Sequence, residues 1–93
     1  MSQTQTRLLI RNEHVESEMI GNEWILLNMK EHVATKLNEL GGYIWSIIPE
    51  YGHMEGIIEK IAEEYDIDRH TAEQDVKPFI EELLGSGLLT YAG

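Results

Sequence analysis

The sequence contains no cysteine and only two prolines, and its basic residues are few. Without cysteine the chain forms no disulfide, no thiolate zinc site and no thiol nucleophile. The first eleven residues are polar apart from Leu8–Ile10, so they make neither a secretory signal nor a membrane span, which needs roughly 18 apolar residues. The sequence therefore predicts a cytoplasmic protein that does not enter a membrane.

Acidic side chains outnumber basic ones by 17 to 7, which gives a formal net charge of −10. Such a surface repels nucleic acids and anionic lipids and attracts basic or neutral partners, although the charge also keeps a protein soluble. With 93 residues the chain is expected to form a single domain over 1–93, with residues 1–6 disordered. A domain of this size has little room for an enclosed active site.

The N-terminal half has the pattern of three antiparallel strands. Residues His14–Ile20 and His32–Leu37 alternate between two faces, and Trp24–Leu27 is a short apolar run between them. Gly21 and Asn22 favour a two-residue hairpin, because both accept the positive φ angles of the tight turns that join twisted strands. A second turn is expected at 28–31. The sequence therefore predicts a three-stranded meander.

Three helices are expected after this sheet. Asn38 is a predicted N-cap, and the apolar repeat behind it is expected to end at Pro49. Gly41 and Gly42 are poor residues for a helix interior, which indicates that a strand approaches the helix closely there. The second helix is predicted over 54–65, because its apolar residues recur at helical spacing.

The third predicted helix follows a cap at Asp68 and ends at Gly85. It contains Pro78, which removes one backbone hydrogen bond. Residues 88–91 are long enough for one short strand. The resulting α+β order, a three-stranded antiparallel sheet, three helices and a short terminal strand, is the layout of a winged helix-turn-helix.

From Gly21 onward the chain resembles the PqqD-like family, whose members are also called recognition elements for ribosomally made, modified peptides (RiPPs). The most specific match is Leu-Asn-Glu-x-Gly-x-x-Ile-Trp at 37–45. Further matches lie at Gly21, Trp24–Asn28, Met54, Ile57, Tyr65, Ile67, Asp75–Val76, Phe79–Ile80, Leu83 and Gly87–Leu89. Family members often carry Asp-Gly where this chain has Pro49-Glu50, so the loop after the first helix is expected to differ.

The resemblance implies a non-catalytic domain without a cofactor or metal, which binds the leader of a precursor peptide as a strand added to the third strand, in a cleft closed by the third helix. It also implies a partner enzyme, a leader peptidase or another modifying enzyme. Stand-alone copies serve lasso-peptide pathways and radical-SAM pathways such as that of pyrroloquinoline quinone. The chain resembles a stand-alone copy, with the lasso type favoured.

On this basis the peptide-binding edge is predicted at His32, Val33, Ala34, Thr35, Lys36 and Leu37, and the opposite wall at Ala72, Asp75, Val76 and Phe79. Asp75 is expected to hold a basic leader residue and Lys36 an acidic one. The apolar members of this set have the spacing of ordinary core residues as well. A proline at Val33 or Thr35 is expected to block binding by removing an edge donor.

The sequence leaves two other classes of protein open and disfavours a third. Winged helices often read DNA through the third helix. A helix that faces phosphates should carry a net positive charge, but the acidic residues of this one outnumber its basic residues and histidine: Glu73, Asp75, Glu81 and Glu82 as opposed to Arg69, His70 and Lys77. A structural subunit without cargo of its own is the second alternative. Enzymes are disfavoured, because the four histidines lack zinc-ligand spacing and no serine lies in a nucleophile motif.

Overall fold

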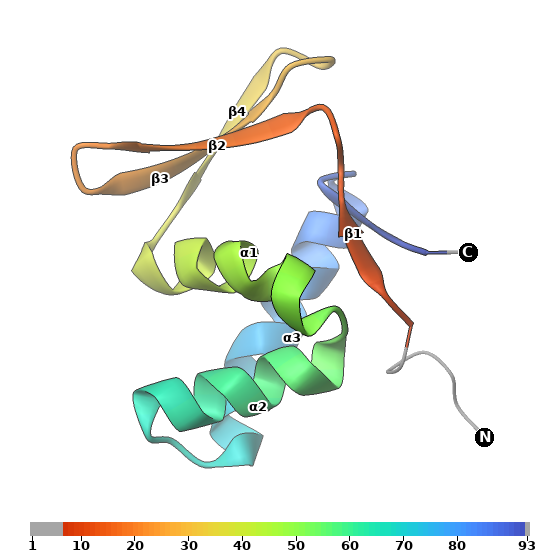
Figure 1. Ribbon diagram of the computed structural model, residues 1–93. Coiled ribbons are helices and arrows are strands. Elements are labelled where there is room, and N and C mark those ends of the chain that lie inside the picture. Colours follow the sequence, from red (N-terminus) through yellow and green to blue (C-terminus); the bar gives the residue numbers. More distant parts are fainter. Residues whose placement is uncertain (1–6, 93) are drawn as a thin grey trace.

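The computed structural model describes residues 7–92, so the disorder expected for residues 1–6 lies outside this range. The predicted α+β order is confirmed, with one strand added at the start (Figure 1). The elements are β1 (Leu9–Arg11), β2 (Val15–Ile20), β3 (Glu23–Asn28), β4 (Val33–Leu37), α1 (Glu39–Tyr51), α2 (Met54–Tyr65), α3 (Arg69–Gly85) and β5 (Leu89–Tyr91). In Figure 1 the sheet of β2, β3 and β4 lies above the helices, and β1 lies to one side.

Strands β2, β3 and β4 form an antiparallel sheet in that order. Ile20 faces Glu23 across the predicted two-residue turn, and Gly21 there has a φ of 64°. One face of the sheet presents Leu26 and Leu37 to the core, with 0 % and 8 % exposure. The opposite face carries Glu16 and Glu18 in solvent. The alternation in the sequence therefore predicted strands β2 and β4, and the structure shows which face of the sheet is buried.

The start of each helix is fixed by a side-chain cap, as predicted for α1 and α3. The Asn38 side chain accepts a hydrogen bond from the Gly41 amide at 2.7 Å, and the Asp68 carboxylate accepts one from the Thr71 amide at 2.7 Å. His53 caps α2 through its ring nitrogen. These bonds satisfy first-turn amides that have no partner within the helix.

The glycine pair in α1 permits close packing on two sides of the helix. A Cβ atom on Gly42 would overlap the indole ring of Trp24, which comes from β3. A Cβ atom on Gly41 would lie 3.1 Å from the Phe79 ring of α3. The predicted approach of a strand to this helix is confirmed, because only glycine leaves room for the Trp24 ring.

The prediction that α1 ends at Pro49 is wrong. An amide at that position would bond to the Trp45 carbonyl, and proline has no amide hydrogen to donate. The Arg11 guanidinium supplies the missing donor at 3.3 Å from that carbonyl. The helix therefore continues to Tyr51, and Gly52 ends it in a left-handed conformation with a φ of 76°. The third helix likewise continues across Pro78.

The pairing of β1 with β5 was not foreseen in the sequence. The two strands are antiparallel, and Ile10 lies opposite Thr90. The Leu9 amide donates to the Gly52 carbonyl at 2.7 Å, and the Arg11 guanidinium lies over the Trp45 ring at 5.3 Å. These contacts fasten the N-terminal strand to α1 and to the turn after it, so β2 leaves from a fixed point.

Candidate peptide-binding site

The backbone of β4 has one paired side and one free side. In an antiparallel pair a residue directs its N–H and C=O to the same neighbouring strand, and successive residues alternate between the two sides. The Met29 amide donates to the His14 carbonyl at 2.8 Å, and these residues continue the β2–β3 register. Because the Met29 backbone faces β2, every second residue back along β3 also faces β2. The backbone groups of the residues between them, Trp24, Leu26 and Asn28, therefore face β4.

The partners of those three β3 residues are Leu37, Thr35 and Val33, so the polar backbone groups of these residues are used within the sheet. Ala34 and Lys36 direct theirs outwards, and within residues 7–92 only β3 pairs with β4. The expectation that a proline at Val33 or Thr35 would remove an edge donor is therefore wrong. It would break a bond to β3 instead.

A groove runs beside the free edge of β4, and α3 forms its opposite wall. Its central part is lined by Thr35 and Leu37 from β4 and by Phe79 and Leu83 from α3, with a volume of about 170 Å³. At one end the groove opens into a wider cavity of about 420 Å³, which shares the lining residues Thr35, Ser86 and Leu88. At the other end lies a cavity that includes Asp75 and Phe79. We call this continuous depression the β4–α3 groove.

Most of the ten residues predicted for binding lie along the β4–α3 groove or its edge. Val33 is 54 % exposed and lines the wide end, and Phe79 lies half-buried in the middle. Asp75 is exposed at the far end, where its carboxylate has no described salt-bridge partner within 4.0 Å. His32 precedes β4 in a left-handed conformation, with a φ of 60°.

Two of the ten differ from their predicted roles in this structure, and a third, Lys36, has an ionic partner within the protein. Ala72 and Val76 are both 0 % exposed and belong to the hydrophobic core, so they support the wall of the groove from beneath and offer no surface to a guest. The Lys36 ammonium group already lies 3.3 Å from the Glu23 carboxylate. The apolar spacing of a helix in the sequence does not distinguish residues that line a groove from residues of the core, because both kinds lie on the same apolar face.

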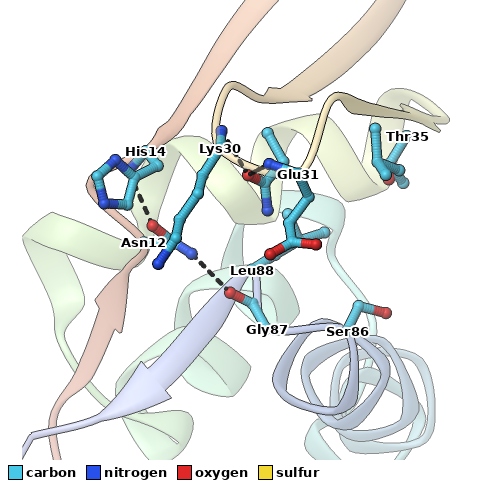
Figure 2. A pocket seen from close by; sticks show the side chains of 10 residues that line it. Asn12, His14, Lys30, Glu31, Thr35, Ser86, Gly87 and Leu88 are labelled. Atoms are coloured by element: carbon cyan, nitrogen blue, oxygen red, sulfur yellow. Dashed lines mark hydrogen bonds between the residues drawn. The ribbon is translucent and has the colours of Figure 1, made fainter.

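The β3–β4 loop at the wide end is held by Asn28, which the sequence suggested only as the start of a turn. Its side-chain oxygen accepts hydrogen bonds from the amides of Lys30 and Glu31, at 3.1 and 2.9 Å. Asn28 itself is only 8 % exposed. Asparagine often bonds to amides two or three residues ahead. Figure 2 shows Lys30 and Glu31 projecting from this loop over the cavity.

Asn12 closes the wide end from the opposite side, and sequence reasoning missed it. Its side-chain nitrogen donates to the Gly87 carbonyl at 3.0 Å, and its side-chain oxygen accepts from the His14 amide at 2.8 Å (Figure 2). Asn12 thus joins the start of β2 to the turn between α3 and β5. No local pattern reveals this role, because the contact spans 75 residues of sequence.

Features of other kinds of site are missing from the described part of the chain. In residues 7–92 no three histidine, aspartate or glutamate side chains come together in a way that would hold a metal ion. No helix in this range is long and apolar enough to cross a membrane. The described surface therefore offers a strand edge and a groove, which suit the binding of an extended peptide.

Comparison with protein families decides the identity of this fold. Residues 23–89 match the model of coenzyme PQQ synthesis protein D (PqqD). The chain belongs to the PqqD family. The resemblance seen at 37–45 is thereby confirmed, and the match includes β3, β4 and all three helices.

Two solved structures resemble this PqqD-family chain. TbiB1, in complex with the TbiA(beta) leader peptide, is 33 % identical, with a TM-score of 0.76 over 89 % of this chain and 98 % of that one. Lasso peptide synthetase B1, complexed with the leader peptide, shares the fold at 16 % identity, with a TM-score of 0.77 over 88 % and 96 % of the two chains. The comparison with curated proteins gives no match.

Proposed function

We propose that this PqqD-family chain binds the leader segment of a ribosomally made precursor peptide, catalyses no reaction, and presents the peptide to a leader peptidase or another modifying enzyme. The observation that carries the proposal is the free edge of β4 beside the β4–α3 groove. TbiB1, which is 33 % identical, is a chain in complex with a leader peptide. A lasso-peptide pathway is favoured over a radical-SAM pathway, because both solved structures that resemble this chain are leader-peptide complexes and one of them is lasso peptide synthetase B1.

The backbone of Ala34 and Lys36 supplies two donors and two acceptors for an added strand. These bonds depend little on the sequence of the guest, so they provide affinity rather than selectivity. Every second guest side chain would point to the groove, about 7 Å from the next one on that face. Thr35, Leu37, Phe79 and Leu83 line that face of the groove.

Selectivity would come from the two ends of the groove. Asp75 at the far end favours a basic leader residue there, which agrees with the net charge of −10. The wide end combines the apolar Val33 and Leu88 with polar groups from Asn12 and Lys30. A leader residue with both an apolar body and a polar tip would satisfy this lining.

The winged-helix layout is compatible with DNA binding, but the charges on α3 argue against that role. Arg69 at the start of α3 contacts Glu55 and Glu59, and the Lys77 ammonium group lies 3.5 Å from the Glu73 carboxylate. Both cations of the helix are therefore paired with carboxylates. A helix that meets phosphates needs free positive charge.

The direct test is to titrate a fluorescently labelled leader, taken from the precursor encoded beside this chain, into the isolated protein. Saturable binding with a Kd of about 1 μM or tighter, worth roughly −8 kcal/mol, is expected, together with weak binding of a scrambled leader. Mass spectrometry of the same mixture should show an intact peptide, because no catalysis is proposed. An absence of binding without the enzyme would favour the role of a structural subunit.

A further inference from the structure

A second hollow lies on the side of α1 that faces away from the β4–α3 groove. It has a volume of about 450 Å³ and is lined mainly by Met19, Trp24, Tyr43 and Tyr65, which we call the aromatic surface. It has no lining residue in common with any part of the β4–α3 groove. Met19 and Tyr65 are 53 % and 43 % exposed, so the aromatic surface is open to a partner while a peptide occupies the groove.

The side chains of the aromatic surface are held in place before any partner arrives. The Trp24 ring lies over Gly42, where no larger residue would fit, and Met19 is directly opposite Trp24 in the β2–β3 register. The rings of Tyr43 and Tyr65 meet edge to face, with centroids 6.0 Å apart. Rigid aromatic anchors lose little conformational entropy on binding and dominate the energy of many protein interfaces.

Carboxylates flank these aromatic rings. Glu39 and Glu64 line the same hollow. The Glu64 carboxylate lies 3.5 Å from the Lys60 ammonium group, whereas Glu39 has no salt-bridge partner within 4.0 Å among residues 7–92. Partial burial, with Glu64 adding to it, raises the pKa of Tyr43, and burial, with Glu39 and Glu64 adding to it, raises the pKa of Tyr65. Tyrosine hydroxyls are protonated donors at neutral pH even with their ordinary pKa, and these raised pKa values keep them so. Apolar rings beside carboxylates suit arginine, which stacks on aromatic faces and pairs with carboxylates.

We propose that the aromatic surface docks the enzyme that receives the leader, through a patch on that enzyme with an apolar centre and arginine or lysine at its rim. This inference rests on the proposed function. The net charge of −10 argues against a second copy of the chain as the occupant, because two such copies repel each other. Separate surfaces for leader and enzyme would let one small domain hold both at once.

The experiment measures two affinities for each variant by biolayer interferometry: one for the purified enzyme encoded beside this chain, and one for the labelled leader. Met19→Arg should weaken enzyme binding at least tenfold and leave leader binding within twofold, because the new guanidinium would occupy the rings and carboxylates proposed for the enzyme's arginine and would repel that arginine. Met29→Arg is the matched control, since Met29 is equally exposed, at 55 %, and lines no described cavity. Glu64→Arg should also weaken enzyme binding, whereas Glu81→Arg on α3 should not.

The two proposals fail in different ways. Loss of leader binding in the parent protein would contradict the proposed function and leave the enzyme measurements readable. Unchanged enzyme binding in both Met19→Arg and Glu64→Arg, with the leader still bound, would overturn the docking proposal alone. Dimerisation of the parent in sedimentation analysis, abolished by Met19→Arg, would assign the surface to a second copy and also overturn it. Circular dichroism of each variant confirms that the fold is retained.

Discussion

Replacing Ala34 with proline tests the strand-addition mechanism at a single backbone group. The Ala34 amide points away from β3, so its loss breaks no bond of the sheet, and proline is tolerated on an edge strand. A guest strand loses one hydrogen bond, and its own carbonyl is left without a donor. Together these effects cost about 2–4 kcal/mol, which weakens leader binding by roughly 30- to 700-fold.

Fluorescence anisotropy with the labelled leader measures this loss, and thermal unfolding shows whether the variant is folded. Ser17→Pro is the matched control. The Ser17 amide also points away from β3, but it lies on the other edge strand, β2, so this variant should leave the affinity unchanged. Thr35→Pro should instead destabilise the protein by about 1–3 kcal/mol, because it removes a bond to Leu26 and leaves that carbonyl without its donor. A folded Ala34→Pro protein that binds the leader as tightly as the parent would refute strand addition at β4.

Three further predictions concern charge, packing and pH. Asp75→Lys should weaken binding of a basic leader by about fivefold, worth about 1 kcal/mol, and added salt should reduce the affinity of the parent but hardly that of the variant. Gly42→Ala should lower the free energy of unfolding by about 1–3 kcal/mol in urea, because the new methyl group displaces Trp24. The hydrogen bond from the Thr71 amide lowers the pKa of Asp68, so the stability it contributes is present above the ordinary carboxyl pKa and lost as pH falls through the lowered one. Asp68→Asn should flatten that part of the acid unfolding curve, measured by circular dichroism.

Much of the fold was predictable because its signals are local. The Gly21-Asn22 turn, the Asn38 and Asp68 caps and the apolar period of α2 each depend on a few neighbouring residues. The strand at Leu9–Arg11 was missed for the same reason. Three residues carry no readable period, and their partner β5 lies at the other end of the chain.

The binding residues were predictable only in part. The sequence indicated β4 as the edge, but which of its residues have free backbone groups depends on the hydrogen-bonding phase, which starts from the turn between β2 and β3. That phase selects Ala34 and Lys36. The depth of a side chain on α3 depends on how the helix is rotated against its neighbours, so Val76 became core and Phe79 became lining.

By itself, the sequence determined the order of the elements from β2 onward, the caps of α1 and α3, the acidic surface and the family, because each of these follows from composition or from residues close together in the chain. Only the tertiary structure decided that the Arg11 guanidinium bonds to the Trp45 carbonyl, that Asn12 joins β2 to the α3–β5 turn, and that β4 has a free side facing a groove. These features arise where distant segments meet. Their geometry is set by the packing of the whole chain.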